Sequence, residues 1–176
     1  QGDPSTGRLM GDILRNVVRW GTGRRALNAV KVGPSTVPLA GKTGTTNGYR
    51  NAAFAGFVPK FKSGGWAWPE GFTLVTYVGH DDNTPMRRRS IRLQGSNGAL
   101  PVWIGTVDGL SDVGLLGQPT DGSIPELVVE TGFQTVPVSI ETGIPTEEAA
   151  VEDGPSVLVS GEERPTRRFS PVGMAT

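Results

Sequence analysis

The sequence has 176 residues and a mass of 18.5 kDa, enough for one ordinary domain or for one domain with a tail. Its 17 basic and 17 acidic side chains cancel, so net charge provides no general attraction to nucleic acid or to a membrane. Cysteine is absent, which excludes disulfides, thiolate zinc sites and cysteine nucleophiles, and a single histidine, His80, excludes a site of several histidines. No apolar run approaches the ~20 residues that a membrane-spanning helix needs.

Charge and proline divide the chain into two parts. Residues 1–117 contain 14 basic and 7 acidic side chains, whereas residues 118–176 contain 3 and 10, together with seven of the 14 prolines. We therefore expect a basic body over 1–117 and an acidic, Pro-rich tail over 118–176 that is extended or ordered by a partner. Simple solubility of each part is an equally good explanation of the charge pattern.

The predicted elements alternate between helices and strands. An apolar stripe at helical spacing predicts a helix over 5–20, which Gly21 and Gly23 end. A short second helix over 24–30 is a weaker prediction. The expected strands are 37–45, 52–58 and 72–78, with loops at 46–51 and 59–71 and a helix at 98–110. Short connections between the three strands favour an antiparallel sheet, so we predict an α+β fold with helices flanking that sheet.

Several short motifs indicate a function only weakly. G-K-T at 41–43 lacks the upstream glycine of a phosphate-binding loop, and G-T-G-R-R-A at 21–26 follows a helix rather than the strand that dinucleotide binding needs. The arginine-rich run 87–92 could contact phosphates or an acidic partner, although a solvated loop is the better interpretation. The cluster at 80–83 (H-D-D-N) is more typical of a turn than of a metal site. We predict no metal site, no cofactor and no nucleic-acid partner.

The sequence K-T-G-T at 42–45 indicates more specific chemistry. K-T-G occurs in serine acyltransferases that act on penicillins or on peptidoglycan peptides. The Lys42 ammonium supplies positive charge and a proton relay beside a nucleophile, and the hydroxyls of Thr43 and Thr45 lie on one side of a strand, where they can bind a carboxylate. Gly44 keeps the strand open to a substrate that lies against the backbone.

Three segments in order, G-T-G-R-R-A-L (21–27), A-G-K-T-G-T-T-N-G-Y-R-N-A-A-F-A-G-F-V-P (40–59) and Y-V-G-H-D-D-N-T-P-M (77–86), extend this signal. Together they resemble the C-terminal half of the transpeptidase domain of class A penicillin-binding proteins, the bifunctional peptidoglycan synthases. The resemblance covers about residues 6–110 and implies part of that domain's α+β fold.

The resemblance also implies residue roles. Lys42 would be catalytic, contacting the serine of an S-x-N motif, and Thr43 and Thr45 would hold the carboxylate of a substrate or penicillin. The backbone N–H of Thr45 would be one donor of the oxyanion hole, while Asn47 and Tyr49 would lie at the rim of the cleft.

One departure from the family's pattern is severe, because the family's nucleophile belongs to an S-x-x-K motif. No serine of this sequence begins S-x-x-K or S-x-N, so we expect the chain by itself to perform no acylation. Lys42 would then be a relic or would be complemented by another chain. Three readings follow: the K-T-G half of a D,D-transpeptidase, a repurposed structural or accessory subunit of a larger assembly, or a weak binding domain for peptidoglycan peptides. The resemblance places each of them outside the cytoplasmic membrane, on its periphery, with another protein chain as the expected partner.

Overall fold

The computed structural model describes residues 4–62, 65–119, 133–139, 142, 145 and 156–160. Its helices are α1 (Pro4–Trp20) and α2 (Leu100–Asp112), with short helical turns η1 (Arg24–Ala26), η2 (Asn47–Tyr49) and η3 (Gly95–Ala99). The strands are β1 (Lys31–Val32), β2 (Ser35–Thr36), β3 (Ala40–Thr45), β4 (Asn51–Lys62), β5 (Gly65–Gly79), β6 (Arg87–Arg88), β7 (Ile91–Arg92), β8 (Phe133–Pro137) and β9 (Ser156–Ser160).

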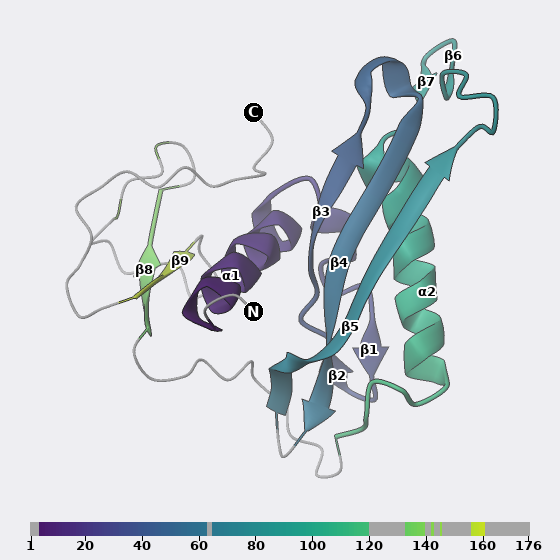
Figure 1. The fold of residues 1–176 in the computed structure, drawn as a ribbon. Helices are drawn as coiled ribbons and strands as arrows, with labels where there is room; N and C mark the ends of the chain where they lie inside the picture. The colour runs from purple at the N-terminus through teal and green to yellow at the C-terminus, as the bar shows by residue number, and fades with distance from the viewer. Residues whose placement is uncertain are drawn as a thin grey trace.

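The centre of the fold is a three-stranded antiparallel sheet in the order β3-β4-β5, with α1 on its β3 side and α2 along one face (Figure 1). The predicted α+β fold with an antiparallel sheet and flanking helices is therefore confirmed. The predicted helix at 5–20 matches α1, and the predicted helix at 98–110 matches α2, which the π-helical turn η3 precedes. The predicted second helix is reduced to the single turn η1.

The predicted loop at 59–71 is wrong, because β4 and β5 continue as a long hairpin to Lys62 and from Gly65. The strand register shifts between Pro59 and Lys60, and such an irregularity accommodates a residue that has no N–H for the ladder. Beyond the shift, the Phe61 and Trp66 rings meet edge to face at 5.8 Å, and Trp66 is 1% exposed. Aromatic packing therefore extends a hairpin that glycine and proline suggested would end early.

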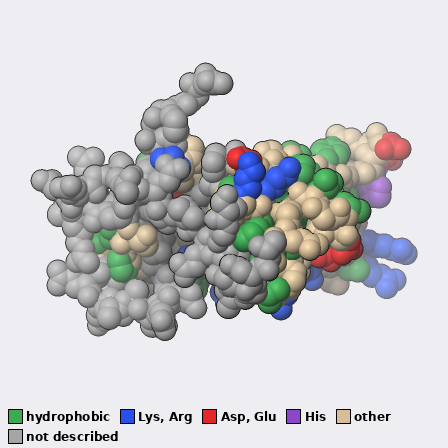
Figure 2. All heavy atoms as spheres, turned by 90° about the horizontal axis from the view of Figure 1, so that it is seen from below, with side chains coloured by type: hydrophobic (Ala, Val, Ile, Leu, Met, Phe, Trp, Pro, Cys, Tyr) green, Lys and Arg blue, Asp and Glu red, His purple; other side chains and the backbone are tan. Residues whose placement is uncertain are grey.

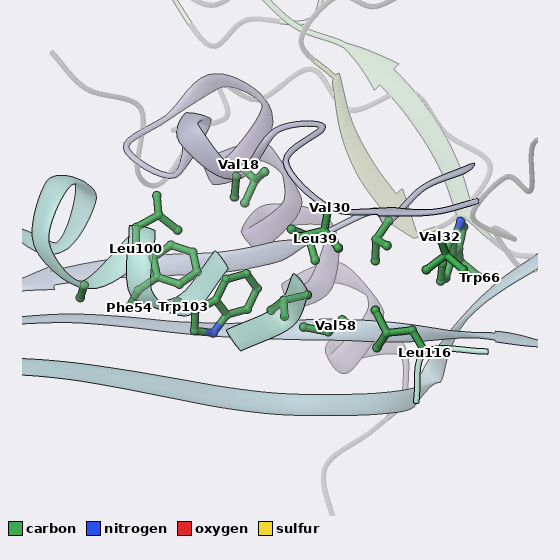
Figure 3. Packing of buried hydrophobic residues seen from close by; sticks show 14 of the residues in the cluster. Val18, Val30, Val32, Leu39, Phe54, Val58, Trp66, Leu100, Trp103 and Leu116 are labelled. Carbon is green, nitrogen blue, oxygen red and sulfur yellow. The ribbon is translucent and has the colours of Figure 1, made fainter. Parts of the chain in front are cut away.

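The core lies between the sheet and α2 (Figure 3). Phe54 on β4 and Trp103 on α2 are fully buried, and their rings meet edge to face at 4.9 Å. The Trp103 indole N–H donates to the Leu74 carbonyl of β5 at 3.1 Å, so the tryptophan joins helix to sheet by both packing and a hydrogen bond. A Cβ on Gly56 would lie 2.6 Å from the Trp103 ring, which explains glycine at that point of the sheet.

The opposite face of the sheet is open in the described part of the chain. Register pairs Lys42 with Ala55 and Ala55 with Val75, so these three side chains share that face. Ala55 is exposed, and Val75 and Tyr77 of β5 are 68% and 67% exposed. Apolar side chains on a sheet face are normally covered by another layer, so this face is suited to contact with a further protein segment.

Within residues 118–176, β8 and β9 form a separate two-stranded antiparallel sheet, which lies beside α1 (Figure 1). Val136 of β8 is 2% exposed. Most of the proposed tail lies outside the described residues, and its division from the body at residue 117 stays a prediction. Where the chain is described, no helix has both the length and the hydropathy needed to cross a membrane.

Candidate functional site

The K-T-G-T segment forms β3, the outer strand of the three-stranded sheet. The Thr46 N–H donates to the Asn51 carbonyl at 3.0 Å, and this bond shows which residues of β3 are hydrogen-bonded to β4 and which are not. Residues of an antiparallel strand point their backbone groups alternately toward and away from the partner strand. The backbone N–H and C=O groups of Thr43 and Thr45 therefore point away from β4, along the unpaired edge of β3.

Lys42 and Thr43 meet at this edge. The Lys42 ammonium donates to the Thr43 carbonyl at 3.0 Å and to the Thr43 hydroxyl at 3.2 Å, and both side chains are half-buried. Lys42 begins on the open face of the sheet and Thr43 on the α2 face, so the long lysine side chain reaches around the strand edge to bring the two groups together.

Thr22 completes this cluster, although no motif in the sequence predicted a role for it. Its hydroxyl lies 2.7 Å from the Thr43 hydroxyl. The loop after α1 holds it there, because the N–H groups of Gly21 and Gly23 both bond the Val17 carbonyl, at 3.0 and 3.1 Å. The G-T-G motif that contains Thr22 was the one signal for it in the sequence. That motif does not indicate dinucleotide binding here, because the helix α1 precedes it instead of a strand.

Thr45 lies two residues beyond Thr43, so the two side chains are on the same face of β3. Its hydroxyl accepts a hydrogen bond from the Gly95 N–H at 3.0 Å, which fixes the side chain against η3. The Thr45 side chain is exposed, and its hydroxyl proton remains available to an acceptor. Thr45 thus anchors η3 through its hydroxyl oxygen and still has a hydroxyl proton to donate at the end of β3.

Gly44 faces the open side of the sheet beside Lys42. A Cβ at Gly44 would find its nearest neighbour, the Ala53 Cβ, at 3.5 Å, an ordinary van der Waals distance. Packing among the described residues therefore does not require glycine here. The absence of a side chain instead leaves the surface of β3 flat where a ligand or another segment could approach.

Asn47 and Tyr49 lie in η2, the turn between β3 and β4. Asn47 is exposed and Tyr49 is half-buried, and the Arg92 guanidinium lies 5.5 Å from the Tyr49 ring centre. The Met86 N–H donates to the Tyr49 carbonyl at 2.7 Å, so the segment after β5 is held against this turn. The rim positions that the resemblance implied are therefore next to the strand edge, while their role in binding stays a prediction.

The arginine-rich run forms the hairpin β6–β7 above this turn. Arg87, Arg88, Arg89 and Arg92 are all exposed, and basic side chains gather toward this end of the molecule, at the right of Figure 2. The solvated-loop interpretation agrees with this exposure.

The H-D-D-N segment forms a turn at the end of β5. The Asp82 carboxylate accepts hydrogen bonds from the Thr84 N–H at 3.0 Å and the Thr84 hydroxyl at 2.8 Å. These bonds stabilise the charged form and lower the pKa of Asp82 below its ordinary value of 3.8. Among the described residues, no group of three His, Asp or Glu side chains is placed to bind a metal ion.

Comparison with known proteins identifies the relatives of this site. The chain is 36% identical over 102 residues to penicillin-binding protein 1A of Pseudomonas aeruginosa, an alignment that covers 58% of this chain and 10% of that protein. Penicillin-binding protein 1A of Aquifex aeolicus is 36% identical over 97 residues, and that of Neisseria gonorrhoeae is 34% identical over 102. The resemblance to penicillin-binding proteins is confirmed. No protein-family model matches the chain.

A solved structure supports the same conclusion for the fold. The crystal structure of penicillin-binding protein 1A from Haemophilus influenzae matches 91% of this chain and 21% of that chain, with a TM-score of 0.51 and 23% sequence identity. This chain spans about a tenth of the length of the curated relatives that it matches. The similarity therefore concerns one region of penicillin-binding proteins rather than the whole molecules.

Proposed function

We propose that this chain provides the K-T-G wall of a peptidoglycan D,D-transpeptidase site, and that the nucleophilic serine lies outside these 176 residues. The observation that carries the proposal is the cluster at the edge of β3. There the Thr43 hydroxyl lies 3.2 Å from the Lys42 ammonium and 2.7 Å from the Thr22 hydroxyl. A cation beside two hydroxyls on an unpaired strand edge is suited to bind the carboxylate of a peptide or of a penicillin.

The unpaired edge suggests how the chemistry would be assisted. An acyl transfer passes through a tetrahedral intermediate whose negatively charged oxygen needs donors fixed in advance. The backbone N–H of Thr45, which points away from β4, would be one such donor. Lys42 would stabilise negative charge and relay a proton to the serine side of the cleft. Thr43 and Thr45 would hold the substrate carboxylate, and Gly44 and Asn47 would leave room for the peptide.

The open face of the sheet supports the requirement for a further segment. Exposed Ala55, Val75 and Tyr77 lie on the same face as Lys42. A segment that carries S-x-x-K and S-x-N would cover this apolar face and bring its serine toward the lysine. The resemblance to penicillin-binding proteins also leads us to place this activity outside the cytoplasmic membrane.

Penicillin labelling tests the proposal. The chain is mixed with a polypeptide that carries the S-x-x-K and S-x-N motifs of a related transpeptidase, and a fluorescent penicillin is added. We expect covalent label on the serine of the second polypeptide only when this chain is present. Equal labelling with and without the chain would contradict a role in the site.

The alternative is a non-catalytic structural or accessory subunit of a larger assembly, for which the same exposed apolar face would be the contact surface. Native purification followed by mass spectrometry separates the two functions. Co-elution with a polypeptide that bears S-x-x-K and S-x-N supports the transpeptidase. Co-elution with an unrelated membrane assembly, without such a polypeptide, supports the structural subunit.

A further inference from the structure

The dipeptide Asn-Gly occurs twice in this chain, at 47–48 and at 97–98, and each asparagine follows a hydroxyl residue, Thr46 or Ser96. In this dipeptide the asparagine amide reacts readily with the backbone nitrogen of the next residue, because glycine has no Cβ to hinder the approach. The two local sequences are closely matched. A difference in reactivity between them must therefore come from the fold.

Asn97 is held by hydrogen bonds although its side chain is exposed. Its Oδ1 accepts from the Gln94 N–H at 2.7 Å, and its Nδ2 donates to the Arg92 carbonyl at 3.0 Å. The Gly98 N–H, which belongs to the attacking nitrogen, donates to the Gln94 carbonyl at 2.7 Å. Both reacting groups are thus engaged in η3, and these bonds must break before the groups can meet.

Asn47 lies in a more open turn. It is also exposed, and its side-chain amide has no hydrogen-bond partner among the residues that the structure describes. Gly48 has a φ of +72°, and a Cβ built on it would meet one atom within 4 Å, the Arg50 Nε at 4.0 Å. Neighbouring atoms therefore leave room for the amide to reorient. The Arg50 guanidinium also places positive charge beside this peptide bond, which favours loss of a proton from its nitrogen.

We propose that Asn47 is a site of spontaneous deamidation, and that Asn97 is protected from the same reaction by its hydrogen bonds. The Gly48 backbone nitrogen loses its proton and forms a bond to the Asn47 Cγ, and the side-chain nitrogen leaves as ammonia, which gives a cyclic succinimide. Water then opens the ring at either carbonyl carbon and leaves aspartate or isoaspartate. The reaction consumes one water, releases one ammonia, and involves no oxidation or reduction.

The modification would change the end of the K-T-G strand. Asn47 is two residues from Thr45, and its neutral amide becomes a carboxylate that is ionised at neutral pH. Isoaspartate also lengthens the backbone of the turn in which the Tyr49 carbonyl accepts from the Met86 N–H. A negative charge here would oppose a substrate carboxylate, so the wall would weaken as the chain ages. This consequence rests on the proposed function, whereas the reaction at Asn47 does not.

Peptide mapping of the 176-residue chain tests the reaction. The folded chain is incubated at mildly alkaline pH, digested at low pH, and both asparagines are followed by mass spectrometry, which detects exchange of the amide for a carboxyl group. We expect Asn47 to convert at least about 10-fold faster than Asn97, since the hydrogen bonds of Asn97 must first break. In urea, where the fold is lost, the two rates should agree within about threefold. Equal rates in the folded chain, or faster conversion at Asn97, would overturn the proposal.

Penicillin labelling with the S-x-x-K polypeptide tests the consequence. Asn47→Asp reproduces the new charge, and Asn28→Asp is its control, because Asn28 is exposed and its φ of 56° is one that aspartate also adopts. We expect Asn47→Asp to lower the labelling rate about 10-fold and Asn28→Asp to leave it unchanged. Equal rates for Asn47→Asp and the unaltered chain would overturn the consequence alone. Absence of label with the unaltered chain would overturn the proposed function and the consequence together.

Discussion

Replacing Gly95 by alanine should destabilise the chain and disturb the K-T-G edge. A Cβ at Gly95 would lie 2.7 Å from the Ala53 carbonyl oxygen, 2.8 Å from the Gly44 carbonyl oxygen and 2.8 Å from the Thr43 Cβ. Two of these atoms are backbone oxygens of the sheet and the third is a Cβ, so they cannot move aside as the end of a flexible side chain could. Displacing η3 instead would break the hydrogen bond from Gly95 to the Thr45 hydroxyl.

The cost follows from these contacts. Overpacking costs about 1–3 kcal/mol, and loss of one hydrogen bond adds about 1 kcal/mol. Alanine recovers up to about 1 kcal/mol of helix propensity over glycine. The free energy of unfolding should therefore fall by about 1–3 kcal/mol in Gly95→Ala.

Gly98 in the same turn is the matched control. Its Cβ would meet its nearest neighbour, the Leu93 Cβ, at 3.5 Å, an ordinary contact. Gly98→Ala should therefore be neutral or stabilise the chain by up to about 1 kcal/mol. Urea unfolding followed by circular dichroism measures both variants. Equal stability of Gly95→Ala and Gly98→Ala would refute the close packing of η3 on β3.

Three further changes test other contacts. Trp103→Phe should lower the free energy of unfolding by about 1–3 kcal/mol, because it leaves the Leu74 carbonyl without its donor and creates a void; an unchanged urea midpoint would contradict this. Thr22→Val keeps the shape but removes the hydroxyl bonded to Thr43, and should cost about 1 kcal/mol in the same assay, with no loss if that contact is absent in solution. The lowered pKa of Asp82 means that its turn is stabilised above the ordinary pKa of 3.8 and that this stabilisation is lost as pH falls through the lower folded value. NMR titration of the carboxyl carbon of that aspartate should give a midpoint below 3.8, and a midpoint at or above 3.8 would contradict the hydrogen-bonded turn.

The sequence predicted the elements whose signals are local. The stripe of apolar residues in α1 and the β-branched run in β5 have clear periodicity, and each element formed where that pattern lies. The extension of the β4–β5 hairpin was missed because it depends on Phe61 packing against Trp66 across the hairpin. Glycine and proline near that point are typical of a loop, and only the tertiary contact overrides them.

The residues that meet at the edge of β3 were predictable only where they belong to one motif. K-T-G-T selected Lys42, Thr43 and Thr45 as candidates because the motif is contiguous on one strand, and their role in binding stays a prediction. Thr22 was missed because its approach to Thr43 joins residues 21 positions apart, through a turn whose geometry no local pattern specifies.

The most direct test of the central claim measures penicillin acylation with Lys42 altered. The chain is reassembled with a polypeptide that carries S-x-x-K and S-x-N, and the rate of labelling by fluorescent penicillin is compared for the unaltered chain, Lys42→Ala and Lys31→Ala. Lys31 is an exposed lysine on β1, so its replacement controls for the loss of one positive charge. We predict that Lys42→Ala lowers the rate at least about 100-fold, as expected for loss of a transition-state charge contact, and that Lys31→Ala leaves it unchanged. Equal rates in all three would contradict the assignment of β3 as a wall of a transpeptidase site.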